Sequence, residues 1–211
     1  GHGVASFEGL ERHGLLGALL PESAAALASN RSGALRKVVI AGLRSTDERV
    51  ARDEPVSPAF LFALLLWPAY CRALMGLQAR GMQLEEAQRR AADQVTLRQL
   101  STVALPRRFS QPMQEIWLLQ SRFGTRQRKR VFRMLAHPRF RAAFDFLNLR
   151  LVASDEHAAD VAFWREAQRQ SGDELAATLD ASRAEAGEGG GDASAPRKRR
   201  RRRRRSGSAA E

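Results

Sequence analysis

The sequence predicts an all-α protein that ends in a disordered basic tail, and three observations support this prediction. Ala, Leu, Arg, Gln and Glu dominate the chain, and all five are good helix formers, whereas β-branched residues are few. No stretch alternates apolar and polar residues in the way that marks a half-buried β-strand. Residues 186–196 contain only Gly, Ala, Ser, Pro and acidic residues, so they cannot bury enough apolar surface to offset the entropy of ordering them. Residues 187–211 are therefore predicted to be disordered.

Proline, glycine and capping residues divide the rest of the chain into helices. Ser57 can cap a helix whose first position is Pro58, a place that suits proline. Pro106 closes one predicted helix, Gly124 ends another, and Pro138 opens the one after. The predicted helices are Val4–Leu16, Ala34–Arg44, an apolar one from Pro58, Leu84–Val103, Pro112–Phe123, Thr125–Ala136, Pro138–Val152, Ser154–Gln170 and a short one over Asp173–Ser182.

Several classes of protein fit this sequence poorly. Cys71 is the one cysteine, so no internal disulfide can form and a reducing compartment fits best. No segment resembles a signal peptide. The longest apolar stretch, Pro58–Cys71, is interrupted by Pro68 and falls short of the roughly 20 residues that cross a bilayer, so we expect a buried core helix there and no membrane span. Because the chain begins at Gly1 without an initiator Met, we expect a piece of a longer protein.

The positive charge is concentrated in two places. The run Arg197–Arg205 carries +9 of the net charge of +12. Residues 105–150 contain eleven basic side chains against Glu115 and Asp145, which is another +9, so the remainder of the chain is net negative. Such segregation predicts a polyanionic partner.

The predicted helix Thr125–Ala136 is the most informative element. Four of its cations fall within an arc of roughly 100°, and its apolar residues fall on the opposite side. Like charges at this spacing repel by some tenths of a kcal/mol per pair, and a phosphate backbone would supply the missing partner. A simple solvated basic face is the alternative. The four cations are Arg126, Lys129, Arg130 and Arg133. Arg128 lies near the apolar side, where it is expected to cap or to cover apolar surface with its stem.

Four further arginines stand in turns next to helix starts, where backbone N–H groups favour anions. They are Arg107, Arg108, Arg139 and Arg141. Phosphate contact and plain solvent exposure both fit them. Aromatic residues lie among these arginines and can stack on bases, but their helical spacing favours core packing. They are Phe109, Phe123, Phe140 and Phe144, and Trp117 is also predicted to be core.

The basic run near the end of the chain would bind any polyanion without sequence preference. It resembles a nuclear localisation signal in isolation, but we favour a nonspecific RNA tether. It comprises Arg197, Lys198, Arg199, Arg200, Arg201, Arg202, Arg203, Arg204 and Arg205.

The chain carries no recognisable active site. Its four histidines have no metal-ligand spacing with one another or with Cys71. No phosphate-cradling glycine loop precedes a helix, and no Asp-x-Asp pair is present to hold Mg²⁺. Adjacent acid pairs such as Asp47-Glu48 are expected to cap helices or to face solvent. We therefore expect neither a catalytic nor a metal-binding residue in this chain.

Several stretches, in this order and spacing, resemble bacterial poly(A) polymerases of the class II nucleotidyltransferase superfamily. The resemblance covers roughly residues 1–165 and is densest from Leu105 onward. The matching stretches are Gly1-His2-Gly3, Gly14 to Pro21, Ser57 to Trp67, Leu105-Pro106-Arg107-Arg108-Phe109, Glu115 to Gln120, Arg128-Lys129-Arg130 and Leu135 to Asp145.

The resemblance implies a helical body over residues 1–104, a basic RNA-binding region over 105–171 and a low-complexity tail over 172–211. Enzymes of that family add adenylates from ATP to RNA 3′ ends with Mg²⁺ held in an N-terminal head. That head would precede Gly1, so no catalytic residue of the family maps onto this chain. We expect the chain to bind RNA, to have no activity of its own and no cofactor, and to belong to a cytoplasmic bacterial enzyme that uses ATP and Mg²⁺.

Two alternatives remain open at this point. A fragment of a tRNA CCA-adding enzyme shares the architecture but should prefer folded tRNA, and the arginine-rich tail fits it less well. A stand-alone nucleic-acid-binding helical protein would have no enzyme attached. The sequence leaves RNA preference and oligomeric state undetermined.

Overall fold

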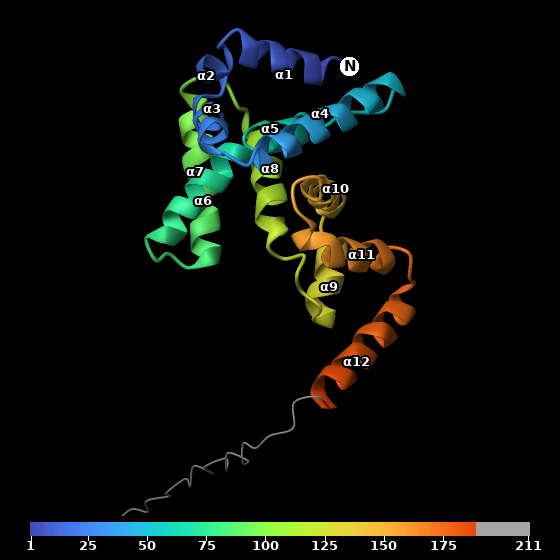
Figure 1. The fold of residues 1–211 in the computed structure, drawn as a ribbon. Helices are drawn as coiled ribbons and strands as arrows, with labels where there is room; N and C mark the ends of the chain where they lie inside the picture. The colour runs from blue at the N-terminus through green and yellow to red at the C-terminus, as the bar shows by residue number, and fades with distance from the viewer. Residues whose placement is uncertain (189–211) are drawn as a thin grey trace, which may run out of the picture.

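The structure, a computed structural model, describes residues 1–188, and side chains as far as Ser182. All regular elements in this part of the chain are helical, which confirms the predicted fold class (Figure 1). The elements are α1 Gly3–Arg12, α2 Leu16–Leu19, α3 Pro21–Ser29, α4 Ala34–Ala51, α5 Pro58–Leu65, α6 Trp67–Ala79, α7 Leu84–Leu100, α8 Arg107–Gln120, α9 Arg128–Leu135, α10 Phe140–Arg150, the 3₁₀ turn η1 Asp155–His157, α11 Ala158–Ala167 and α12 Gly172–Glu188.

One helix prediction was wrong because Pro112 was expected to start a helix, whereas the apolar helix predicted from Pro58 does start there. The helix predicted from Pro112 starts at Arg107, with Pro106 as its N-cap, and Pro112 lies inside it. The lost backbone bond at Pro112 is outweighed by the burial of Met113, Ile116 and Trp117 just beyond it. The apolar helix from Pro58 is interrupted at Leu66, and α6 then starts with Pro68 near its first position.

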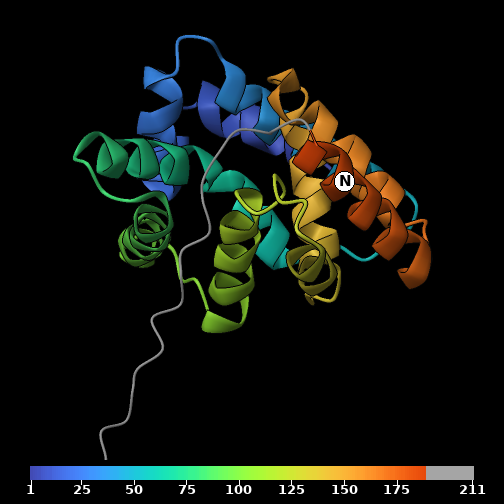
Figure 2. The same ribbon diagram turned by 90° about the horizontal axis from the view of Figure 1, so that it is seen from below.

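The helices pack around two apolar cores. The first joins α1 to α7 with the front of α8 and, through Phe146, one face of α10, and the second joins the end of α8 with α9 to α12. Helix α8 serves both, because Met113 and Trp117 belong to the first core and Leu119 to the second. Both views of the ribbon show α8 lying between the two groups of helices (Figures 1 and 2). The two cores therefore meet at α8 and α10.

Trp117 fixes α8 against α5 and α6. The indole is fully buried, and its N–H donates to the carbonyl of Ala63 at 2.9 Å. Its ring stacks on Tyr70 with centroids 4.7 Å apart. The predicted core role of Trp117 is thus confirmed.

The second core contains the aromatic residues that the sequence places among the arginines. Phe123, Phe140 and Phe144 are at most 6 % exposed, so core packing, the favoured interpretation, is confirmed for them. The Trp164 indole N–H donates to the carbonyl of Phe123 at 2.6 Å, which ties α11 to the loop after α8. This bond holds the segment that leads into α9.

Helix α12 extends the ordered part of the chain beyond the basic region. Leu175, Ala176 and Leu179 are buried, and two of them join the second core. Ser171 and Glu174 form a reciprocal capping box at its start. Residues 172–188 are therefore helical, which corrects the first part of the low-complexity tail predicted over 172–211. The rest of that predicted tail, residues 189–211, lies outside the described part of the chain.

Within residues 1–188, no single helix is long and apolar enough to cross a membrane, although α5 and α6, with a bend of 52° between them, reach that length and composition as a pair.

Asp47, one of the predicted capping acids, caps a helix from a distance in sequence. Its carboxylate accepts the N–H groups of Gly3 at 2.7 Å and Val4 at 3.1 Å, at the start of α1. These two bonds lower the pKa of the Asp47 carboxyl. These two hydrogen bonds therefore hold the start of α1 against α4.

We expect Asp47→Ala to lower the free energy of unfolding by about 1 kcal/mol at neutral pH, the usual cost of a lost N-cap. Because the folded-state pKa is depressed, this stabilisation is present above the unfolded value of about 3.9 and is lost as the pH falls through the folded value. Urea denaturation of both proteins across a pH series measures it. Glu48→Ala, at the exposed neighbouring acid, is the control and should change little. A difference for Asp47→Ala that does not shrink in acid would contradict this role.

Candidate nucleic-acid interface

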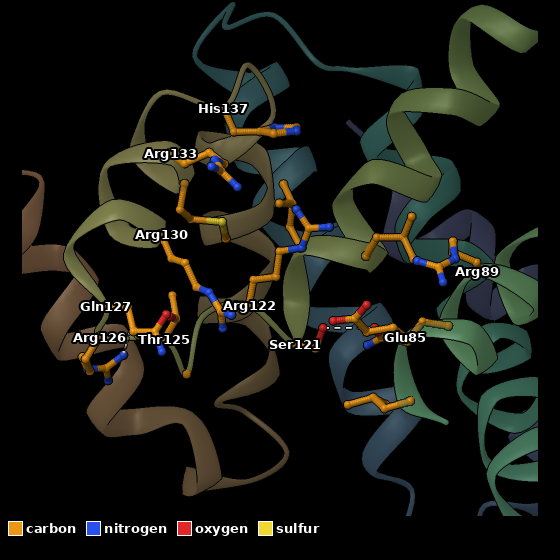
Figure 3. Close-up of a pocket in the computed structure, with 16 residues that line it drawn as sticks. Glu85, Arg89, Ser121, Arg122, Thr125, Arg126, Gln127, Arg130, Arg133 and His137 are labelled. Atoms are coloured by element: carbon orange, nitrogen blue, oxygen red, sulfur yellow. Dashed lines mark hydrogen bonds between the residues drawn. The ribbon is translucent and has the colours of Figure 1, made fainter. Parts of the chain in front are cut away.

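An open groove of about 870 Å³ lies between α7 on one side and α9, with the loop before it, on the other (Figure 3). This size is within the range of sites that hold ligands of nucleotide size and above. The groove is lined by Leu84, Glu85, Gln88, Arg89, Leu118, Leu119, Ser121, Arg122, Gly124, Thr125, Arg126, Gln127, Arg130, Arg133, Met134 and His137.

Three arginines gather on the α9 side of this groove. Val131 and Met134 are buried in the second core. That packing leaves Arg130 and Arg133, three residues apart and so neighbours on the helix surface, on the exposed side. Arg122 joins them from the turn that follows α8. Figure 3 shows Arg130 and Arg133 extending from α9 toward Arg122, with Arg89 and Glu85 across the opening.

None of these three arginines is neutralised within the described residues. Arg122, Arg130 and Arg133 are exposed, and no carboxylate there lies within salt-bridge distance of them. Guanidinium groups that converge without a counter-charge repel one another, and an anion between them removes the repulsion. A guanidinium also presents a planar set of donors that matches phosphate oxygens. The α9 side therefore has the charge and the donors that a phosphate group would require.

The α7 side of the groove is different in character. It offers Glu85, Gln88 and Arg89 together with Leu84, whose surface is 44 % exposed. The side-chain oxygen of Gln88 accepts the hydroxyl of Ser121 at 3.1 Å, which joins α7 to the end of α8. This side combines one carboxylate, one amide, one cation and an apolar patch.

Arg126 does not lie on the helix face to which it was assigned. Helix α9 starts at Arg128, so Arg126 stands in the loop before it. Its guanidinium pairs with Asp160 at 2.7 Å and donates to the carbonyls of Phe123 and Thr125. It also lies over the ring of Phe163, 4.0 Å from the centroid. These bonds hold the loop before α9 against α11, and the helix starts three residues later than predicted.

The remaining predicted arginines are scattered over the surface. Arg139 pairs with Glu115 at 3.1 Å, and Arg141 pairs with Asp145 at 3.3 Å. Arg128, predicted to cap or to cover apolar surface, reaches Asp180 of α12 at 2.7 Å. Away from the groove and exposed lie Arg107, Arg108 and Lys129. Of the eight predicted contacts, the structure thus brings Arg126, Arg130 and Arg133 to the groove, with Arg126 already paired; RNA contact remains a prediction for all eight.

The sequence reasoning missed Arg89 and Arg122 as site residues. Arg89 comes from α7, about 40 residues before α9. Arg122 belongs to a turn rather than to a helix face. Helical periodicity identifies cations that share one face of a helix. It cannot identify cations that come together from three different elements of the fold.

A cluster of three or more His, Cys, Asp or Glu side chains with the geometry to hold a metal ion is absent from the described residues. His137 lies at the groove, where its Nδ1 accepts the backbone N–H of Arg139 at 3.1 Å.

We expect Arg126→Ala to affect stability more than RNA binding. The change removes the pair with Asp160, two bonds to backbone carbonyls and the contact with Phe163, a loss of about 1–2 kcal/mol after allowance for partial exposure. Urea denaturation and RNA titration of the same protein separate the two effects. Lys129→Ala, at an exposed cation with no described partner, is the stability control. An affinity loss for Arg126→Ala as large as that of Arg130→Ala would show that Arg126 contacts RNA instead.

Comparison with known proteins adds to this geometry. The family described as "Polymerase A arginine-rich C-terminus" matches residues 80–206. Poly(A) polymerase I of Salmonella typhi is 33% identical over 151 residues, which are 71% of this chain and 32% of that protein. The enzyme of the same name from Escherichia coli O157:H7 is 33% identical over 173 residues, 80% of this chain and 37% of that protein. That of Haemophilus influenzae is 30% identical over 176 residues, with shares of 82% and 39%. The chain spans about a third of the length of these curated relatives, and it corresponds to their C-terminal part.

Proposed function

Because this chain belongs to the family defined by the arginine-rich C-terminus of polymerase A, we propose that it is the RNA-holding part of a poly(A) polymerase. In this proposal the groove beside α9 grips the phosphates of the RNA primer. The 3′ end is then kept near an active site that another part of the longer protein supplies, where AMP from ATP is added with Mg²⁺. The chain alone binds RNA and has no turnover.

One observation carries the proposal: Arg122, Arg130 and Arg133 converge on a single open groove without a carboxylate partner among the described residues. Other exposed arginines without a salt bridge between described residues, such as Arg12, Arg31 and Arg44, lie on other elements and do not line this groove, whereas Arg139 and Arg141 pair with acids. Unpaired cations on one side of a groove are stabilised by a polyanion, and the counterions that they displace from RNA add affinity. Backbone contacts of this kind position a strand without reading its sequence.

The test is RNA affinity over a salt series. We expect a short single-stranded RNA to bind the whole chain with affinity that falls steeply with salt, with a slope of about −0.7 for each phosphate contacted. A second protein, in which Arg197–Arg205 are replaced by Ser and Gly, separates the basic run from the groove. It should bind more weakly, with a smaller slope, but should still bind. Fluorescence anisotropy measures both. If neutralising the run abolished binding altogether, the groove would have no part in holding RNA.

A further inference from the structure

We propose that this groove also selects bases: its α7 side prefers RNA bases that carry an exocyclic amino group, adenine and cytosine, over uracil. This inference rests on the proposed function, since it requires RNA in the groove. It goes beyond that function because phosphate contacts alone would treat all bases alike.

The two sides of the groove offer opposite chemistry. The α9 side presents Arg122, Arg130 and Arg133, which are donors only. The α7 side presents the carboxylate of Glu85, which accepts only, and the amide of Gln88, whose oxygen accepts from Ser121 and whose nitrogen is left as a donor. A strand that lays its phosphates along α9 would turn its unpaired bases toward α7. The Glu85 carboxylate would then meet the amino group of a base, and the Gln88 nitrogen would meet a ring nitrogen or carbonyl oxygen of the same base.

The carboxylate of Glu85 is free for such a role. Arg89 lies one helical turn beyond it and is the natural i,i+4 partner, yet within the described residues neither of the two forms a salt bridge. The neighbouring pair on the same helix behaves differently, because Glu86 and Arg90 do pair, at 2.9 Å. On α7, therefore, the acid outside the groove is paired with an arginine, whereas Glu85, which lines the groove, has no salt-bridge partner among the described residues. An ionised carboxylate accepts from the amino group of cytosine or adenine. The one donor on the corresponding edge of uracil, N3–H, lies between two carbonyl oxygens that repel the carboxylate.

Gln88 is positioned to add a second hydrogen bond. The residue is only 6 % exposed, and Ser121 fixes it by donating to its oxygen. The amide nitrogen takes part in no hydrogen bond between described residues, although the residue lines the groove. A glutamine held by a neighbour presents its amide in one orientation, so it can hydrogen-bond a base edge with little ordering cost.

The groove also has surfaces on which a flat base can lie. Leu84 and Leu118 line it, and the exposed part of Leu84 gives an apolar contact. Arg89 has no described partner, and a guanidinium plane can stack on an unpaired base. A volume of about 870 Å³ leaves room for a base as well as a phosphate.

The experiment compares oligocytidylate with oligouridylate of equal length, because cytosine has an amino group at C4 beside an unprotonated N3, whereas uracil has a carbonyl at C4 beside N3–H. Oligoadenylate is the third ligand. The whole chain is used with Arg197–Arg205 neutralised, so that the basic run does not mask the groove. We expect cytidylate and adenylate to bind about tenfold more tightly than uridylate, the size of one specific base contact.

Two variants assign that preference to residues. Glu85→Gln with Gln88→Leu should bring the affinities for cytidylate and uridylate within about twofold of each other. Overall affinity should hold or rise, because an anion leaves a cationic groove. Glu86→Gln is the matched control: it removes the same charge one residue away, outside the groove, and should keep the preference.

The outcomes separate this inference from the function on which it rests. Equal affinity of the tail-neutralised chain for cytidylate and uridylate, with steep salt dependence intact, would overturn base selection and leave the RNA-holding function standing. A preference that survives the double change at Glu85 and Gln88 would overturn the assignment to α7. If no RNA bound at all, the proposed function itself would fall.

Discussion

Replacing Arg122, Arg130 and Arg133 together with Ala should weaken the binding of single-stranded RNA by about 100-fold at low salt. Each of the three would lose one charged contact with phosphate, worth about fivefold or slightly more. The slope of log affinity against log salt should fall by about 2, because three phosphate contacts contribute about 0.7 each. Anisotropy titrations over a salt series, with the basic run neutralised, measure both quantities.

The control for this change is a triple variant of equal charge far from the groove. Arg12, Arg31 and Arg44 are exposed, form no salt bridge between described residues, and belong to α1, the α3–α4 loop and α4. Their joint replacement with Ala should change RNA affinity by no more than about threefold, through the loss of general charge. Equal losses for the two triple variants would show that RNA responds to net charge and not to the groove.

Trp117→Ala should lower the free energy of unfolding by about 3–5 kcal/mol, the usual cost of removing a buried tryptophan. The change leaves a cavity beside Tyr70 and leaves the carbonyl of Ala63 without its donor. Because α8 joins the two cores, a loss at Trp117 should loosen both groups of helices. Urea denaturation followed by circular dichroism measures the effect.

Met75→Ala is the matched control for Trp117→Ala. Met75 is also a large apolar residue on a helix of the first core, but it is 69 % exposed. Its replacement should change stability by less than about 0.5 kcal/mol. A similar loss of stability for Met75 and Trp117 would mean that the two-core packing around α8 does not govern stability.

Much of the fold was predictable because local chemistry dictates it. Ser57 caps α5 and Pro58 takes its first position, as the sequence predicts, and α7 starts at Leu84 as expected. Helix α3 was missed because Pro21–Ser29 is rich in Ala and Ser and has a weak apolar face. Pro112 was expected to start a helix, but it lies inside α8. There the burial of the residues that follow it outweighs the backbone hydrogen bond that proline cannot form.

In the basic region, too, local sequence rules predict only part of what the structure shows. Arg126 and Arg130 are four residues apart, and on a continuous helix they would share a face. In the structure Arg126 lies in the loop before α9. Its guanidinium donates to Asp160, which is 34 residues further along the chain. Arg130 remains free and meets Arg122 and Arg89 at the groove. No local rule anticipates Asp160, because that pair is formed by the docking of α11.

Local sequence is enough to predict the all-helical class, the positions of most helices, the concentration of positive charge in residues 105–150 and the resemblance to bacterial poly(A) polymerases. These properties depend on composition and on neighbours within a turn or two of helix, where propensity, capping and periodicity act. Which arginines stay unpaired, and that Arg122, Arg130 and Arg133 face Glu85 and Gln88 across a groove, depends on the tertiary structure. Charge pairing and desolvation depend on distance in space, and the packing of α7, α8, α9 and α11 sets those distances.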